Sequence, residues 1–340
     1  MGNWSRRRLR ASGRTWLVLS LGLLLVGGGV SLWGEANLVR ITTNFFILCT
    51  LVVALQVFVG NSGIVSFGHV AFFGVGAYTA ALLTIPPNIK ERALPLLPAF
   101  LLNLETGLVA ATLGGALAAL LFALLTGLAL ARMQEQAMAM ATLALLVMMH
   151  AVFANWESVT RGTIGIYGIP RSLNLWVALG GVVVIGGLAL LFKASPTGLY
   201  LQVSREDPLA AQTIGINLFQ VRLVGWLISG ALTGSAGALW AQNILAFGPD
   251  QFYFGETFAL LSMLVIGGLG SVSGAVTGAA VVTVVSELLR DLEGGFTLGP
   301  WSIPELPGLV QLAVAVLIMI ILIYRPEGLL GQREVGGKGR

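Results

Sequence analysis

The sequence predicts an all-α membrane protein, a polytopic transmembrane helical bundle of about ten spans with a short cytoplasmic helix and one or more broken helices. Of its 340 residues, 56% are hydrophobic and only 10% are charged, whereas soluble domains carry about 25% charged residues. A soluble chain could not cover so much apolar surface. Glycine supplies 45 residues, which favours close helix packing because lipid gives little hydrophobic drive between helices.

The apolar segments, taken in order, are each long enough to cross a bilayer, which needs about 20 residues. The run from Phe254 to Leu289 is too long for one span, so we divide it at the glycine-rich stretch 267–271. The predicted spans are 15–33, 40–60, 63–85, 106–131, 136–154, 173–193, 220–246, 254–270, 272–289 and 306–324.

Basic residues predict the orientation. With these spans, thirteen Lys and Arg fall on one side and six on the other, and the termini lie on the richer side. Positive residues mark the cytoplasmic side, so both termini are expected there. Residues 1–14 form a cytoplasmic tail, 15–324 the transmembrane domain, and 325–340 a charged, glycine-rich cytoplasmic tail expected to be mobile. Because no basic stripe carries interleaved aromatic residues, nucleic-acid binding is excluded.

Two segments, 60–69 and 267–274, place Gly and Ser inside apolar sequence. Irregular backbone at membrane depth survives only where protein or water covers it, and paired interruptions indicate a transport path. The alternative is two turns between spans near the cytoplasmic face, with His69 in a structural role. The candidate path residues are Asn61, Ser62, Ser66, His69, Ser271 and Ser273.

Glycines at helical spacing predict two packing seams. A double GxxxG pattern lets helix backbones approach closely. One seam comprises Gly270, Gly274 and Gly278, and the other comprises Gly230, Gly234 and Gly237.

Motifs for chemistry are sparse. The sequence has no GxxxxGK[ST] phosphate loop, no HExxH and no cluster of carboxylates within a span. Cys49 is the single cysteine, which excludes an internal disulfide. Residues 60–63 match the GxSG of intramembrane serine proteases, with His150 as a conceivable base for Ser62. This remains a remote alternative to a transport subunit that is no enzyme and holds no cofactor or metal.

The loop 194–219 between two spans predicts a cytoplasmic helix over 204–215 after a turn at 194–198. Ser204 and Asp207 match a capping box, Pro208 suits a first turn, and Gly215 can end the helix. The small apolar face and the acidic start indicate a docking site for a partner protein.

These residues resemble the permease subunits of ATP-binding-cassette importers. Residues 209–215 (LAAQTIG) are similar to the family's Glu-Ala-Ala…Gly loop, with Leu209 in place of the glutamate. The chain resembles more closely the M-type permease of high-affinity branched-chain amino-acid importers. The matching stretches are 66–81 (SFGHVAFFGVGAYTAA), 161–170 (RGTIGIYGIP), 205–207 (RED), 267–271 (GGLGS) and 324–329 (YRPEGL).

The resemblance implies a multi-pass protein of the bacterial inner membrane that works by alternating access. It implies a heterodimer with a homologous companion permease, two cytoplasmic ATPase subunits that hold ATP and Mg²⁺, and a periplasmic or lipid-anchored binding protein. Urea and short-amide permeases share these motifs and remain the alternative for the substrate. The residues implied in ATPase coupling are Arg205, Glu206, Asp207, Leu209, Ala210, Ala211 and Gly215.

Overall fold

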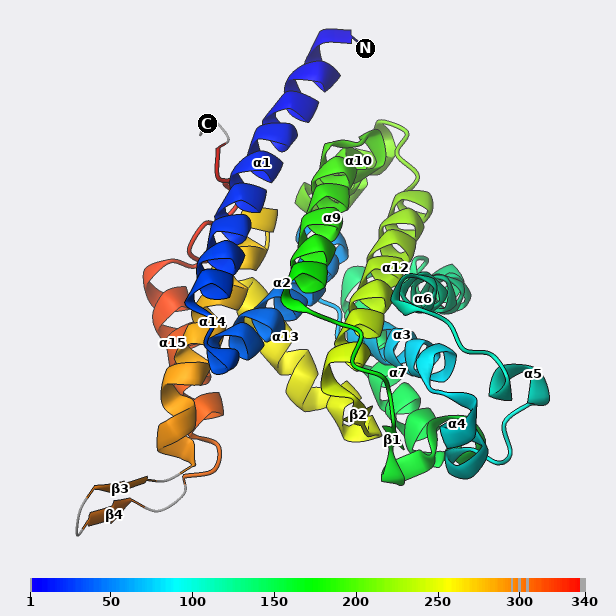
Figure 1. The fold of residues 1–340 in the computed structure, drawn as a ribbon. Coiled ribbons are helices and arrows are strands. Elements are labelled where there is room, and N and C mark those ends of the chain that lie inside the picture. The colour runs from blue at the N-terminus through cyan, green and yellow to red at the C-terminus, as the bar shows by residue number, and fades with distance from the viewer. Residues whose placement is uncertain (1, 295, 299–300, 304–305, 337–340) are drawn as a thin grey trace.

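Helices build nearly all of the described chain. The structure is a computed structural model that describes residues 2–294, 296–298, 301–303 and 306–336. Met1 of the predicted N-terminal tail lies outside the described residues, and so do Lys338 and Arg340 of the charge pattern. Figure 1 shows the helices as one bundle, with two short β-ribbons at its edge.

The helices are α1 (Gly2–Trp33), α2 (Ala36–Ser62), α3 (His69–Thr84), α4 (Pro87–Ala93), α5 (Ala99–Leu102), α6 (Leu108–Leu130), α7 (Glu135–Asn155), α8 (Glu157–Thr160), α9 (Leu175–Ala194), α10 (Pro196–Glu206), α11 (Pro208–Thr213), α12 (Leu218–Ile244), α13 (Phe254–Gly267), α14 (Val272–Glu293) and α15 (Leu309–Tyr324), with 3-10 turns η1 (Gly162–Ile164) and η2 (Pro249–Phe252). The strands β1 (Ile166–Tyr167) and β2 (Ala246–Phe247) pair antiparallel, as do β3 (Phe296–Leu298) and β4 (Trp301–Ile303).

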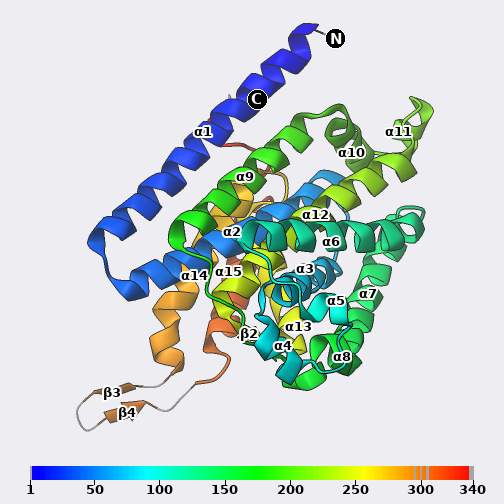
Figure 2. The ribbon, with the colours of Figure 1, turned by 45° about the vertical axis from the view of Figure 1, so that its right-hand side comes forward.

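The core is built around α2 and α12. Helix α12 packs on α2, α3 and α6, and α9 covers another side of α2. In α2 and α12, 61% of the most apolar stretch is buried, against 22% in α1 and α6. Figure 2 shows α1 lying along the outside of α9. The indole Nε1 of Trp16 donates to the carbonyl of Val183 at 3.0 Å, which ties these two helices together.

The prediction of ten spans was too high. Within the described residues, seven helices are long and apolar enough to cross a membrane, or eight if α3 and α4, bent by 118° from each other, count as one broken span. The predicted segments 63–85, 254–270 and 306–324 contain helices of 16, 14 and 16 residues. At about 1.5 Å per residue these fall short of a hydrocarbon core of about 30 Å.

The predicted break within 254–289 is confirmed, because α13 ends at Gly267 and α14 begins at Val272. Residues 63–68 likewise separate α2 from α3. At the N-terminus, the segment predicted as a tail continues α1 as one helix.

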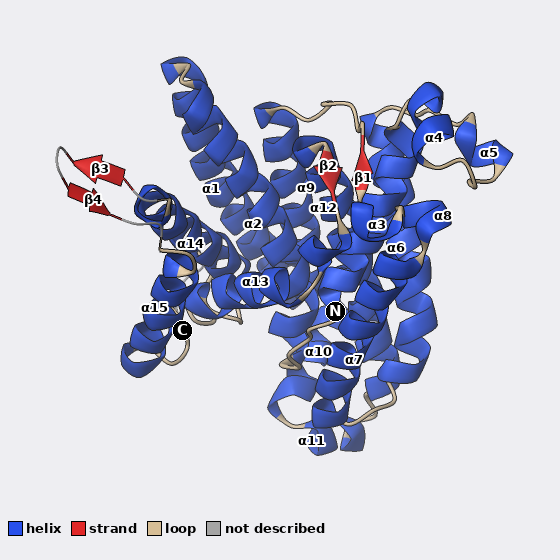
Figure 3. Cartoon of the chain, turned by 90° about the horizontal axis from the view of Figure 1, so that it is seen from below, coloured by secondary structure: helices blue, strands red, loops and turns tan. Residues whose placement is uncertain are grey.

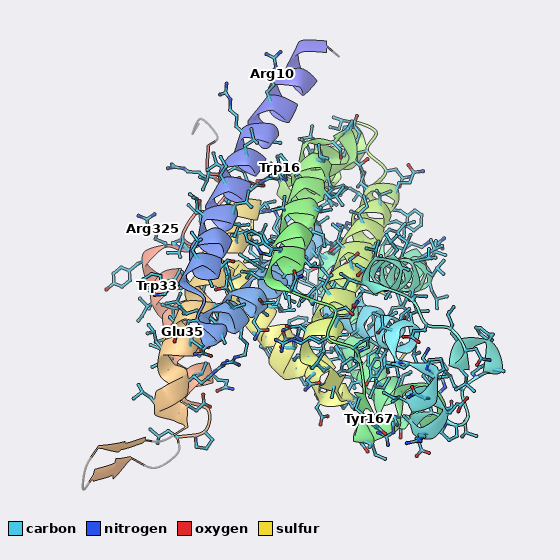
Figure 4. All side chains as sticks on the ribbon, in the orientation of Figure 1. Arg10, Trp16, Trp33, Glu35, Tyr167 and Arg325 are labelled. Atoms are coloured by element: carbon cyan, nitrogen blue, oxygen red, sulfur yellow. The ribbon has the colours of Figure 1, made fainter. Side chains whose placement is uncertain are left out.

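The two ends of the bundle differ. Figure 1 shows both termini at the same end as α10, with α4 and the β3–β4 ribbon at the other end. In Figure 4, Arg10 and Tyr167 mark these opposite ends. Figure 3, seen from below, shows the β1–β2 ribbon beside α3 and α12.

Candidate functional site

Two short helices, α10 and α11, form an elbow where a turn and one helix were predicted. Ser195 caps α10, since its hydroxyl accepts from the amide of Gly198 at 3.1 Å. The predicted cap Ser204 is instead buried in the last turn of α10, and its hydroxyl donates to Leu201. The predicted helix 204–215 is therefore shorter, over 208–213, and the predicted turn 194–198 is limited to Ser195, because α10 begins at Pro196.

Pro208 explains the break. A proline disfavours helical backbone in the residue before it, and Asp207 is extended, with φ −152° and ψ 105°. Extended backbone is what an N-cap adopts. The Asp207 carboxylate then accepts from the amides of Leu209 and Ala210 at 2.9 and 3.0 Å. The local sequence thus starts a new helix at Pro208.

Helix α11 presents an apolar surface outward. Leu209 and Ile214 are 74% and 71% exposed, and Ala210 is exposed, whereas Ala211 is buried against the bundle. Gly215 follows the helix with φ +86°, a left-handed conformation, and the space where its side chain would stand is open. Any other residue at Gly215 would strain the backbone, so Leu209 is the better position at which to test docking.

Arg205 points the other way, into the bundle. Its guanidinium donates to the carbonyl of Gly60 at 2.8 Å. Its aliphatic carbons lie against Gly63, where a Cβ would approach Arg205 Cγ to 2.7 Å and where φ is +74°. Glu206, by contrast, is exposed. The elbow is therefore attached to the end of α2 by Arg205, while α11 stays free on its outer side.

The two glycine-rich segments meet beside this attachment. A side chain at Gly60 would collide with the carbonyl oxygen of Leu269. Lys193 donates to the carbonyl of Gly270 at 2.6 Å, and the amide of Gln202 donates to Asn61 at 3.1 Å. We call this set the junction; it comprises Gly60, Asn61, Lys193, Gln202, Arg205 and Gly270. A cavity of about 480 Å³ is lined by all six. Residues predicted for coupling and for the path thus share one cavity.

The described part of the C-terminal segment, residues 325–336, is a strap packed on the bundle. Its Leu329 and Leu330 amides donate to Ile266 and Gly267 at 2.9 and 3.0 Å. The expectation of a mobile tail was wrong for these residues, because a charged, glycine-rich sequence does not reveal which buried groups it will meet.

Glu334 anchors the strap. Its carboxylate accepts from the amides of Val272 and Ser273 at 3.0 Å, from the Ser273 hydroxyl at 2.7 Å and from Lys193 at 2.6 Å. Burial raises the pKa of Glu334, but the Lys193 charge and these hydrogen bonds outweigh it and hold the pKa below its ordinary value. Glu334 was not among the predicted site residues, and its only visible sign in the sequence was one carboxylate ahead of a glycine-rich end.

The predicted path residues are buried and hydrogen-bonded in this conformation. Ser66 and Ser229 lie at 2.7 and 2.8 Å from the two ring nitrogens of His69. The His69 ring packs against Phe58, Phe72 and Trp226. These contacts give His69 a structural environment, and its part in a transport path stays a prediction.

Ser62 and Ser271 of that set make local bonds, whereas Ser273 bonds to Glu334 of the strap. Ser62 donates to the carbonyl of Phe58 at 2.8 Å and accepts from the amide of Ile64 at 3.1 Å. Ser271 caps α14 by accepting from Gly274 at 3.0 Å. Of the six path candidates, Asn61 is the one that lines the junction cavity.

The protease geometry does not occur in the described residues. His150 lies 3.2 Å from Asp250 and stacks on Tyr253, with ring centroids 4.1 Å apart. Ser62 bonds within its own helix end instead. Nucleophilic catalysis needs a serine within hydrogen-bond reach of its base, and this pair has no such contact.

The predicted seam glycines lie where helices approach closely. A Cβ at Gly230 would come within 2.8 Å of Ala123, and a side chain at Gly234 would overlap Ala119. Gly237 faces the backbone of Phe73. On the other seam, Gly274 faces Gly267, Gly278 faces Met263, and Gly270 faces Gln332. Gly230, Gly234 and Gly237 join α12 to α3 and α6, and Gly274 and Gly278 join α13 to α14. Gly270 precedes α14 and contacts the strap instead, so its predicted place in a helix seam was wrong.

Comparisons with known proteins fit this architecture. The family described as "Branched-chain amino acid transport system / permease component" matches residues 37–323. The high-affinity branched-chain amino acid transport system permease protein LivM of Salmonella typhimurium is 27% identical over 327 residues, covering 86% of this chain and 69% of the relative. LivM of Escherichia coli K12 gives the same figures. The guanosine ABC transporter permease protein NupQ of Bacillus subtilis is 37% identical over 78 residues, 23% of this chain and 24% of that protein.

Proposed function

We infer that this chain, which belongs to the family of permease components of branched-chain amino acid transport systems, carries branched-chain amino acids across a bacterial inner membrane. It is an ATP-binding-cassette permease of that family, and such permeases are not themselves enzymes. The observation that carries the substrate proposal is the similarity to LivM along 86% of the chain. NupQ, named as a guanosine permease, is similar over a much shorter stretch.

The energy for transport comes, in this proposal, from separate ATPase subunits that contact α11. The exposed Leu209 and Ala210 offer the contact surface. Arg205 transmits displacement of α11 to the end of α2, and Lys193 transmits it to the turn between α13 and α14. Both glycine-rich segments would then move together, which suits alternating access.

The proposed assembly also contains a homologous companion permease and an external binding protein, and both termini and α11 face the cytoplasm. The common end of the bundle on which the termini and α10 lie supports this orientation. So does the excess of basic residues on that side. Substrate selection then rests largely on the binding protein, and Asn61 in the junction cavity is the proposed path residue of this chain.

Uptake of labelled leucine by the assembled transporter tests the substrate. Isoleucine and valine are expected to compete strongly, whereas urea and guanosine are expected to compete weakly. Dominant competition by urea or guanosine would overturn the amino-acid assignment and leave the permease assignment intact.

Affinity purification from native membranes, with mass spectrometry of what is retained, tests the assembly. A second similar permease and ATPases carrying phosphate-binding loops are expected. Recovery of this chain alone would contradict the assembly. In the purified complex, Leu209→Asp is expected to preserve membrane insertion but reduce transport per ATP hydrolysed, while the apolar control Leu209→Met retains it.

A further inference from the structure

A groove of about 730 Å³ lies between α11 and the turn that joins α6 to α7. One wall consists of Pro208, Leu209 and Gln212, the other of residues 131–136, and the floor includes Phe219 and Arg222. We call it the α6–α7 groove. Residues 131–136 and α11 are more than 70 residues apart along the chain, so the sequence alone does not connect the turn with this helix.

The groove is held open by bonds from its floor. Arg222 is 6% exposed, and its guanidinium donates to the carbonyl of Met133 at 3.1 Å and to the carboxylate of Glu135 at 3.0 Å. The guanidinium of Arg132 stands over the ring of Phe219, 5.2 Å from its centroid. The turn is thus fixed at both ends to the start of α12.

Its lining is that of a protein contact. Leu209 on one wall and Met133 on the other are 74% and 37% exposed, although charged neighbours place this end outside the hydrocarbon layer. Exposed apolar side chains with a polar rim are typical of protein–protein interfaces. The charges are asymmetric: Arg132 lines the groove on the turn, whereas Asp207, which directly precedes the lining residue Pro208, caps the start of α11.

We propose that the α6–α7 groove receives a segment of the ATPase subunit, so that the turn 131–136 is a second docking element beside α11. This rests on the proposed function. The inserted segment presents an apolar side chain to Leu209 and Met133, an acidic group to Arg132 and a basic group to Asp207, because opposite charges must meet across the rim. Because the turn is bonded to the start of α12, an ATPase segment in this groove would also be connected mechanically to the central helix of the bundle.

Thiol protection tests the proposal in the full transporter. Cys49, the single cysteine, is buried and is replaced by alanine. Cysteines are then introduced singly as Gln134→Cys on the turn, Gln212→Cys on α11 and Gln220→Cys as control. Gln220 is exposed near the same end but does not line the groove. A water-soluble maleimide is applied to the permease with and without its ATPase subunits.

The expected result is loss of labelling at Gln134→Cys and Gln212→Cys when the ATPases are bound, with no change at Gln220→Cys. Protection of Gln212→Cys alone would overturn the groove and keep docking on α11. Labelling of all three positions in a complex that retains its ATPases would overturn docking at this end altogether. Failure of any ATPase to copurify would overturn the proposed function and the groove together.

Reversing the charge of Arg132 gives a second test of the proposed groove. Arg132→Glu is expected to cause loss of ATPase on salt washing, whereas Arg132→Lys, which keeps the charge, retains it. Equal retention by the two variants in a stably folded permease would contradict the proposed acidic contact.

Discussion

At the scale of single residues, glycine positions decide how closely helices approach. Gly234 on α12 faces Ala119 and the carbonyl of Gly115 on α6, whereas Gly180 on α9 has no neighbour within 4 Å of its would-be Cβ. Both are helical glycines in a bundle, so composition alone treats them as equivalent. Only their surroundings differ.

Gly234→Ala is expected to lower stability by about 1–3 kcal/mol, because the methyl group overpacks a close contact. The control Gly180→Ala is expected to leave stability unchanged or raise it by roughly 0.5–1 kcal/mol, as alanine favours helix over glycine. Thermal unfolding in detergent measures both. A lower unfolding temperature for Gly180→Ala than for Gly234→Ala would contradict the packing assignment.

Arg205 is the residue at which the elbow enters the bundle. Arg205→Ala removes the hydrogen bond to Gly60 and the packing on Gly63, while α11 remains capped by Asp207. Transport per ATP hydrolysed is therefore expected to fall while ATPase binding persists. Arg171→Ala, at an exposed arginine elsewhere, serves as control. Unchanged coupling in Arg205→Ala would refute the transmission role.

At the scale of elements, the strap 325–336 closes over the turn between α13 and α14. Gly268 lies against Glu327, Gly328 and Gly331, and Glu334 caps the N-terminus of α14. Irregular backbone inside a membrane protein must be covered by protein or water. The strap supplies that cover, which explains how α13 can end within the bundle.

The strap is expected to loosen in acid. A carboxyl whose pKa is lower in the folded state stabilises the fold above its unfolded pKa, and this contribution is lost as pH falls through the folded pKa. For Glu334 the loss therefore begins below the ordinary glutamate value of about 4.3. This loss is measured by the hydrogen-exchange protection of residues 325–336, corrected for the pH dependence of the intrinsic exchange rates.

Glu334→Gln should lower this protection at neutral pH and flatten its pH dependence, because the charge that Lys193 pairs with is gone. Arg333→Gln, at the exposed neighbour, should leave both as they are. Identical pH profiles for Glu334→Gln and the unmodified protein would show that another group anchors the strap.

At the scale of the whole molecule, the number of helices that cross the membrane decides whether the two termini lie on the same side. Seven crossing helices would put the termini on opposite sides of a membrane, while an eighth, made of α3 and α4, brings them to the same side. Both termini lie at one end of the bundle in Figure 1. An even number of crossings, such as the eight that include the broken pair, fits this arrangement.

Labelling from each side of the membrane checks the topology. In a Cys49→Ala background, Asn103→Cys and Arg333→Cys, both at exposed positions, are expected to react from opposite sides, with Arg333→Cys reacting from the cytoplasm. Reaction of both from the same side would contradict the eight-span arrangement.

The sequence by itself determined the class of molecule and most helix positions. Apolar runs of about 20 residues can be stable only as membrane helices, and Gly267–Ser271 marks the division of the longest run. The exposed apolar position of Leu209 was also predictable, since it depends on a short local motif, and docking there stays a prediction.

The tertiary structure decided what depends on contacts between distant residues. Gly60 meets Leu269, Lys193 binds Glu334, and Arg222 fixes the turn beside α11. It also limited α3, α13 and α15 to 16, 14 and 16 residues, which is shorter than the spans predicted there. Hydropathy measures only the transfer of a local segment into lipid. Where a helix stops and what covers its end depend on packing and hydrogen bonds from elsewhere in the chain.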